Sequence, residues 1–158
     1  MQMAEPAQGH AGVIAPPPVL YAVPLGLGLL LERAIPAPLL PRTLARLLGG
    51  SLVAGATAVE AWFILTMRRA ATPINPRKPV ARLVTDGPFR VSRNPSYLAL
   101  AALYIGIASL VNTRWPLFLL PTVLAVVQRG VIEREEQYLE RKFGDEYRRY
   151  RARVRRWL

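Results

Sequence analysis

The sequence of 158 residues contains no cysteine and a single histidine, His10. The lack of cysteine excludes disulfides, thiolate nucleophiles and cysteine-ligated metal centres. Because His10 lies in a Pro/Gly-rich N-terminal stretch, we expect neither a histidine-based proton relay nor a metal site. No Lys or Arg precedes Arg33, so we expect no cleavable signal peptide, which would need a basic start. The sequence also lacks a G-x-G-x-x-G loop and an alternating strand–helix pattern, so a Rossmann-type nucleotide fold is not expected.

Apolar residues are plentiful, since 52% of the chain is hydrophobic, yet the net charge is +11. Small membrane proteins combine these two properties more easily than soluble domains do. Apolar segments span residues 19–31, 44–67, 97–111 and 115–127. A helix needs about 20 apolar residues to cross the hydrocarbon core, so only residues 44–67 reach that length comfortably. We predict an all-α fold, a polytopic membrane helical bundle of about four transmembrane helices, with tilt or flanking residues extending the shorter ones.

The link at residues 112–114 is so short that it predicts an antiparallel helical hairpin. We expect residues 1–18 to be a flexible N-terminus and residues 19–158 to form one domain. Seventeen of the 21 Lys and Arg residues lie within residues 68–96 and 129–158. Four crossings would place these two regions on one side, which the positive-inside rule makes cytoplasmic. Because the cations lie beside apolar segments, we expect membrane lipids, and no nucleic acid, as partners.

The C-terminal tail is predicted to form amphipathic helices. Residues 133–143 are rich in helix formers, and Gly144 and Asp145 suit the end of one helix and the N-cap of the next. Apolar side chains recur at three- and four-residue spacing: Leu139, Phe143, Tyr147, Tyr150, Val154 and Trp157. This stripe, opposite a basic face, predicts helices that lie on anionic lipid headgroups. A solvated basic tail is the alternative.

Two polar clusters flank the predicted hairpin. The first is TDGPFRVSRNPSYL, residues 85–98, whose prolines favour irregular backbone with free N–H and C=O groups. The second consists of Glu133, Glu135 and Glu136. Because the start and the end of a hairpin meet at one face, we expect the clusters to be neighbours. Alternatively, the arginines of the first cluster are interfacial anchors, and the glutamates pair with cations one turn along their own helix.

These residues resemble a known family. The stretch LVTDGPFRVSRNPSYL is similar to the motif of the isoprenylcysteine carboxyl methyltransferase family, which reads roughly L-V-T-x-G-x-(Y/F)-x-x-x-R-(H/N)-P-x-Y. The tail from Glu135 to Tyr150 resembles that family's E-E-x-x-L-x-x-x-F-G-x-x-Y-x-x-Y signature. The resemblance covers residues 83–157, about half of the chain. The R-(H/N)-P-x-Y part also recurs in membrane sterol reductases and phospholipid N-methyltransferases, whereas both parts together are more specific.

The resemblance implies an integral membrane methyltransferase that uses S-adenosylmethionine, with its catalytic region at residues 81–158. Carried over by position, the residues implied to bind the cofactor are Leu83, Val84, Phe89, Asn94, Pro95, Ser96, Tyr97 and Glu135. The carboxylate-binding arginine of the family falls on Val131, which is a departure. Arg129 and Arg134 are the candidates to replace it as catalytic residues. If neither does, the acceptor is not expected to be a prenylcysteine carboxylate.

We therefore expect methyl transfer to a lipophilic acceptor at a site that faces the cytoplasm. A carboxylate acceptor is favoured, because it is ionised near neutral pH and needs no general base. The acceptor is expected to arrive from the bilayer between residues 44–67 and 115–127. Glu60 lies inside the first of these segments. Because a carboxylate is costly within a membrane-spanning segment, Glu60 is a catalytic candidate by default. Pairing with an arginine, or protonation, would also explain its presence there. A lipid amine as acceptor, a membrane reductase and a non-enzymatic membrane protein are the alternatives.

Overall fold

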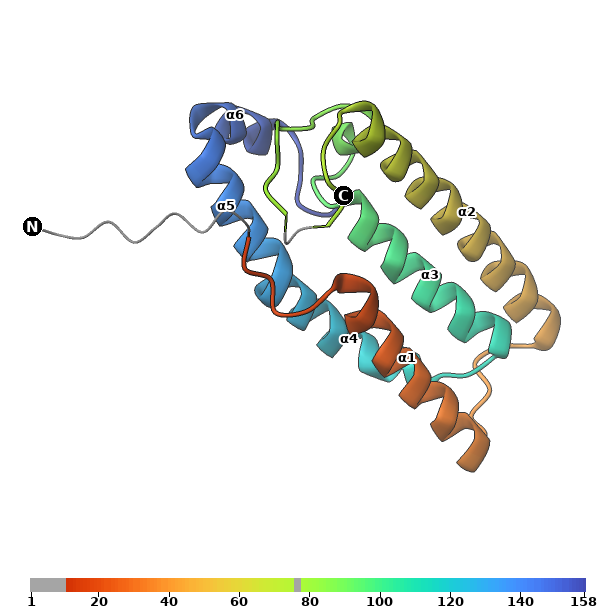
Figure 1. Cartoon of the computed structure of the whole chain (residues 1–158). Helices are drawn as coiled ribbons and strands as arrows, with labels where there is room; N and C mark the ends of the chain where they lie inside the picture. Colours follow the sequence, from red (N-terminus) through yellow and green to blue (C-terminus); the bar gives the residue numbers. More distant parts are fainter. Residues whose placement is uncertain (1–10, 76–77) are drawn as a thin grey trace, which may run out of the picture.

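The computed structural model describes residues 11–75 and 78–158, and this part of the chain contains helices and no strand. The predicted all-α class is therefore confirmed for the described residues. Figure 1 shows the longer helices side by side in a bundle, with the C-terminal helices at one end of it. The helices are α1 (Pro17–Ala34), α2 (Arg42–Arg69), α3 (Pro95–Val111), α4 (Trp115–Val127), α5 (Glu133–Phe143) and α6 (Asp145–Arg153), with a 3-10 turn at Gly87–Arg90 and a π-turn at Gln128–Ile132.

Two helices of the described chain are long and apolar enough to cross a membrane. They are α2 and the continuous helix Trp115–Phe143, which α4, the π-turn and α5 form together. The apolar helix α3 has 17 residues, because Asn112 ends it in the left-handed conformation. The four crossings that we predicted are thus not all supported. Length and composition support two crossings. One is α2, and the other is the segment at residues 115–127, which becomes long enough because its helix continues into α5, whereas α3 stays short.

The link between α3 and α4 is the tight antiparallel turn expected from residues 112–114. Asn112 has φ 60° and ψ 50°, a conformation that asparagine tolerates better than most residues. Its side-chain oxygen accepts hydrogen bonds from the backbone N–H groups of Leu39 (3.1 Å) and Leu40 (2.9 Å). The α3–α4 turn and the α1–α2 link therefore lie together, at the end of the bundle opposite α5 and α6 (Figure 1).

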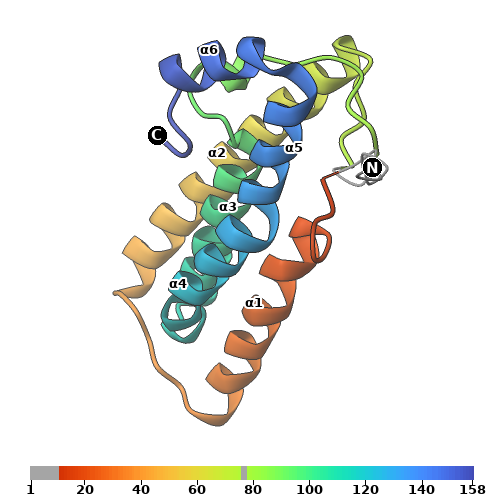
Figure 2. The same ribbon diagram turned by 90° about the vertical axis from the view of Figure 1, so that its left-hand side faces the viewer.

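The helix α3 lies at the centre of the bundle. It packs against α2 on one side, while α1 packs against both α3 and α4. As a result α3 lies between α2 and α4, as Figures 1 and 2 both show. The entry route that we expected between residues 44–67 and 115–127 is therefore occupied by α3.

The N-terminal stretch is packed against the bundle where it is described. Ala11 and Val13 are buried, and the Ile14 N–H donates to the carbonyl of Gly130 at 3.3 Å. We expected residues 1–18 to be flexible, and residues 1–10 lie outside the described residues. The remainder differs from that expectation, because its apolar side chains cover the π-turn and α1 already begins at Pro17.

The C-terminal tail folds back over the protein instead of presenting its apolar stripe to lipid. Gly144 has φ 52° and turns the chain sharply between α5 and α6. Tyr147 and Tyr150 are 1% and 4% exposed, so the middle of the stripe is buried against the protein itself, while its other residues are partly buried. Two local predictions were also wrong. The second tail helix does not extend to Trp157, because α6 ends at Arg153. Asp145 is not an N-cap, because it makes no capping hydrogen bond and pairs with Arg148.

The close approach of α2 and α3 generates a stability prediction. A Cβ on Gly49 would lie 2.7 Å from the backbone nitrogen of Leu110 and 2.8 Å from the carbonyl oxygen of Gly106, whereas a Cβ on Gly50 meets open space. We expect Gly49→Ala to lower the free energy of unfolding by about 1–3 kcal/mol, as overpacking of helix interfaces does. Gly50→Ala is the matched control and should cause no loss. Equal thermal unfolding midpoints of the two variants in detergent would contradict this packing.

Candidate functional site

A cavity of about 510 Å³ lies at the end of the bundle where the two polar clusters meet. Its walls come from the start of α1, the C-terminal half of α2, the 72–94 connection, the start of α3, and α5 and α6. This volume is within the range of about 300–1,000 Å³ that is typical of small-molecule sites. The structure gathers in it each residue that we expected to bind a cofactor: Leu83, Val84, Phe89, Asn94, Pro95, Ser96, Tyr97 and Glu135, and also Glu60.

Two carboxylates are held by neighbouring residues in the first turn of α3. The Tyr97 hydroxyl donates to Oε1 of Glu135 at 2.7 Å, and the Ser96 hydroxyl donates to Oε1 of Glu60 at 3.0 Å. Since adjacent residues of a helix point in different directions, Tyr97 reaches α5 while Ser96 reaches α2. The other oxygen of Glu60, Oε2, is buried and has no hydrogen-bond partner among the described residues. A free carboxylate oxygen in a cavity wall is a binding group for a donor or a cation.

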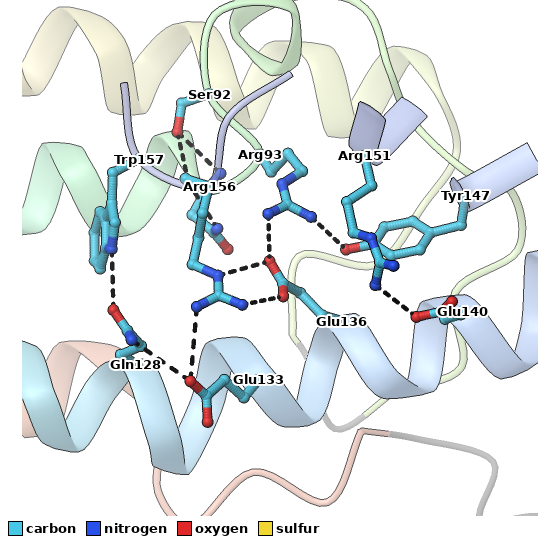
Figure 3. Close-up of polar contacts among 11 residues, drawn as sticks. Ser92, Arg93, Gln128, Glu133, Glu136, Glu140, Tyr147, Arg151, Arg156 and Trp157 are labelled. Atoms are coloured by element: carbon cyan, nitrogen blue, oxygen red, sulfur yellow. Dashed lines mark hydrogen bonds and ion pairs between the residues drawn. The ribbon is translucent and has the colours of Figure 1, made fainter. Parts of the chain in front are cut away.

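The polar wall of the cavity is built around Glu136. Figure 3 shows its carboxylate between two guanidinium groups, with Arg93 Nη2 at 3.2 Å and Arg156 Nη2 at 2.7 Å. The side chains of Arg93 and Glu136 are each only 10% exposed. A buried charge is tolerated when it is paired and hydrogen-bonded, so the second guanidinium compensates for the burial of this carboxylate. Nε of Arg93 is buried and has no partner within the described chain.

Tyrosines of α6 complete this wall. The Tyr147 hydroxyl accepts a hydrogen bond from Arg93 Nη1 at 3.4 Å. Burial raises the pKa of the Tyr147 hydroxyl to about 12, so this group stays neutral at neutral pH and adds no charge beside Arg93. Tyr150 donates to the carbonyl of Phe89 at 2.8 Å, which fixes the 3-10 turn against α6. The tyrosine spacing that we assigned to lipid contact thus supports the cavity.

Asn94 lines the cavity, but its amide is engaged elsewhere. Its Nδ2 donates to the carbonyl of Arg156 at 2.9 Å, and its backbone N–H donates to the Ser92 hydroxyl at 3.1 Å. The Ser92 hydroxyl in turn donates to the same carbonyl of Arg156 at 3.2 Å. Asn94 therefore ties the start of α3 to the C-terminal residues, a role that the sequence did not suggest.

The structure does not bring Arg129 or Arg134 to the cavity. Arg129 is exposed beside a separate hollow that Leu98, Leu124 and Trp157 help to line. Arg134 is also exposed and donates to the carbonyl of Gly12 at 2.9 Å, while Val131 is completely buried. The cations that line the cavity are Arg82 and Arg93. Neither Arg93 nor Arg156 was assigned a site role from the sequence. Arg93 stands in the R-N-P-S-Y stretch, so the motif could have indicated it. Arg156 lies after Tyr150, the last residue of the tail signature, so no motif indicated it.

Comparison with known proteins gives two matches. The model of the family described as phospholipid methyltransferase matches residues 44–146, more than half of the chain. A Haemophilus influenzae protein described only as "Uncharacterized protein" is 63% identical over 35 residues, which are 22% of this chain and 56% of that protein. The chain thus spans about half the length of this curated relative. No solved structure matches the chain.

The arrangement around Glu136 predicts a large loss of stability when its charge is removed. Glu136→Gln would leave Arg93 and Arg156 facing each other, with Arg93 buried, and breaking such a pair costs about 3–5 kcal/mol. Glu133→Gln is the matched control, because Glu133 is 38% exposed and lies 3.6 Å from Arg156. We expect its loss to be about 0–1 kcal/mol. Thermal unfolding of both variants in detergent would refute the account if Glu133→Gln were the more damaging change.

Proposed function

Because the chain belongs to the phospholipid methyltransferase family, we propose that it is a membrane-embedded methyltransferase that uses S-adenosylmethionine and acts on a lipophilic acceptor. The observation that supports this most is the joining of two distant segments in one cavity, with Tyr97 and Glu135 in direct contact at 2.7 Å. The family assignment favours methyl transfer over reductase chemistry. The excess of Lys and Arg residues at the cavity end of the bundle supports a cavity that opens to the cytoplasm.

The residues of the cavity fit the groups of S-adenosylmethionine. When bound, this cofactor supplies a methyl group on a positively charged sulfur. Apolar side chains of the cavity, among them Phe63, Met67 and Phe89, suit its adenine ring. The free Nε of Arg93 suits its carboxylate, and Glu135 suits its hydroxyl or amino groups. Both signs of charge are therefore available within one cavity, as a zwitterionic cofactor requires.

The acceptor that the geometry favours is a lipid amine. Val131 stands where the related family has a carboxylate-binding arginine, and neither Arg129 nor Arg134 lies at the cavity. In contrast, Glu60 offers a buried carboxylate oxygen with no partner among the described residues. An ammonium group must lose a proton before its nitrogen can act as a nucleophile, and Oε2 of Glu60 is the free base that can accept it.

A lipid carboxylate is the second candidate for the acceptor. Arg82 and Arg93 line the cavity, and a guanidinium pairs well with a carboxylate. For either acceptor, the walls of the cavity indicate the route from the bilayer. They include Pro16–Pro18 at the start of α1 and Phe63 of α2. We therefore propose entry at the cavity end of the bundle, beside the start of α1 and the C-terminal half of α2, in place of the route that α3 occupies.

Removal of the Glu135 carboxylate tests cofactor binding. We expect Glu135→Gln and Tyr97→Phe each to weaken the binding of labelled S-adenosylmethionine to the purified protein by about tenfold or more, which corresponds to about 1.4 kcal/mol or more. Glu146→Gln is the control, because Glu146 is exposed on α6. Affinity like that of the wild-type protein in Glu135→Gln would refute the assigned site.

A change at Glu60 tests the acceptor separately. We expect Glu60→Gln to lower kcat for a lipid amine by about 10²–10⁴-fold, the usual contribution of a general base. The dissociation constant for S-adenosylmethionine should change much less than kcat, because Glu60 extends from α2 whereas Glu135, the proposed cofactor ligand, belongs to α5. Mass spectrometry of lipid extracts incubated with isotope-labelled methyl donor identifies the product. A labelled ester, or an unchanged kcat for the amine, would contradict the assignment to Glu60.

A further inference from the structure

The last residues of the chain form part of the cavity region although they belong to no helix. After α6 ends at Arg153, Val154 is extended, with φ −121° and ψ 131°. The chain then returns beside the 92–94 turn, where the Arg93 N–H donates to the carbonyl of Arg155 at 3.0 Å. The carbonyl of Arg156 accepts from both Ser92 and Asn94. Figure 3 shows this segment lying over the turn.

The side chain of Arg156 makes the main charged contact of this segment. Its Nη2 and Nε lie 2.7 Å and 3.1 Å from the two oxygens of Glu136. Glu136 is the same carboxylate that pairs with Arg93, whose side chain lines the cavity. Arg156 therefore acts on the cavity by two routes, through Glu136 to Arg93 and through its own carbonyl to Asn94 and the start of α3.

A few further contacts hold the segment to the bundle, among them the approach of Arg156 Nη1 to Glu133 Oε1 at 3.6 Å. Trp157 packs against the main apolar core and its Nε1 donates to Gln128 Oε1 at 3.3 Å, whereas Leu158 is 66% exposed. No helix or strand includes residues 154–158. Detaching them would break these contacts and leave Glu136 paired with Arg93 alone.

We propose that residues 154–158 are a clasp for the cofactor cavity and that Arg156 is its positioning residue. By holding Glu136 and the 92–94 turn, Arg156 orients Arg93 and the start of α3 for binding. This inference rests on the proposed function. Binding equilibria that are coupled act reciprocally, so a cofactor that binds better to the clasped state must also hold the clasp in place. Contact with the tail then sets the cofactor affinity, and any change that displaces the tail lowers it.

The variants that test the clasp change the charge or the hydrogen-bonding geometry of a single side chain. Arg156→Gln removes the guanidinium, and Arg156→Lys restores a single cation that cannot bond both oxygens of Glu136. Arg149→Gln is the matched control, because Arg149 is exposed on α6 and loses the same charge. We expect the dissociation constant of the full-length protein for S-adenosylmethionine to rise about tenfold in Arg156→Gln, by less in Arg156→Lys, and not at all in Arg149→Gln.

Amide hydrogen exchange of the wild-type protein tests the reciprocal effect and needs no variant. Saturation with S-adenosylmethionine should slow exchange in peptides that cover residues 92–94 and 154–158. If the wild-type protein binds S-adenosylmethionine but the tail exchanges at an unchanged rate, or if Arg156→Gln binds with wild-type affinity, the clasp is refuted and the proposed function stands. If the wild-type protein binds no S-adenosylmethionine, the proposed function fails and the coupling fails with it.

Discussion

Glu136 is a buried carboxylate shared by two arginines that lie 63 positions apart, Arg93 before α3 and Arg156 after α6. Each contact taken alone would be an ordinary ion pair. Together they join α5, the turn that starts α3 and the end of the chain at one point, because removal of the Glu136 charge would leave both guanidinium groups without this carboxylate. The polar wall of the cavity, including the orientation of Arg93 and the burial of Tyr147, depends on this junction.

A second constraint separates the two ends of the bundle. The α3–α4 turn is bound to the α1–α2 link through Asn112, so both connections lie at one end. The polar clusters must then meet at the other end, where the first turn of α3 presents Ser96 to Glu60 and Tyr97 to Glu135. An apolar bundle with most of its charged groups at one end suits chemistry between a polar cofactor and a lipid, since each can approach from its own phase.

Much of this arrangement could be predicted from local patterns. Runs of apolar residues located α1–α4 to within a few residues, and the short link at 112–114 allowed only a hairpin, which in turn brought the two clusters together. The outer parts were harder. A helical wheel assumes regular α-geometry, whereas the π-turn at Gln128–Ile132 changes how later side chains leave the axis. An apolar stripe on a tail looks the same whether it covers lipid or protein, so the burial of Tyr147 and Tyr150 could not be predicted. The role of Arg156 depends on a chain reversal with no sequence pattern.

The central claim is that the segment before α3 and the segment after α4 together form one cofactor site. Photochemical labelling tests it most directly. Ultraviolet irradiation of the purified protein with tritium-labelled S-adenosylmethionine, followed by peptide mapping, should place the label in peptides from both residues 82–97 and residues 133–150, and unlabelled cofactor should compete it away. Competable label confined to residues outside both segments would contradict the account.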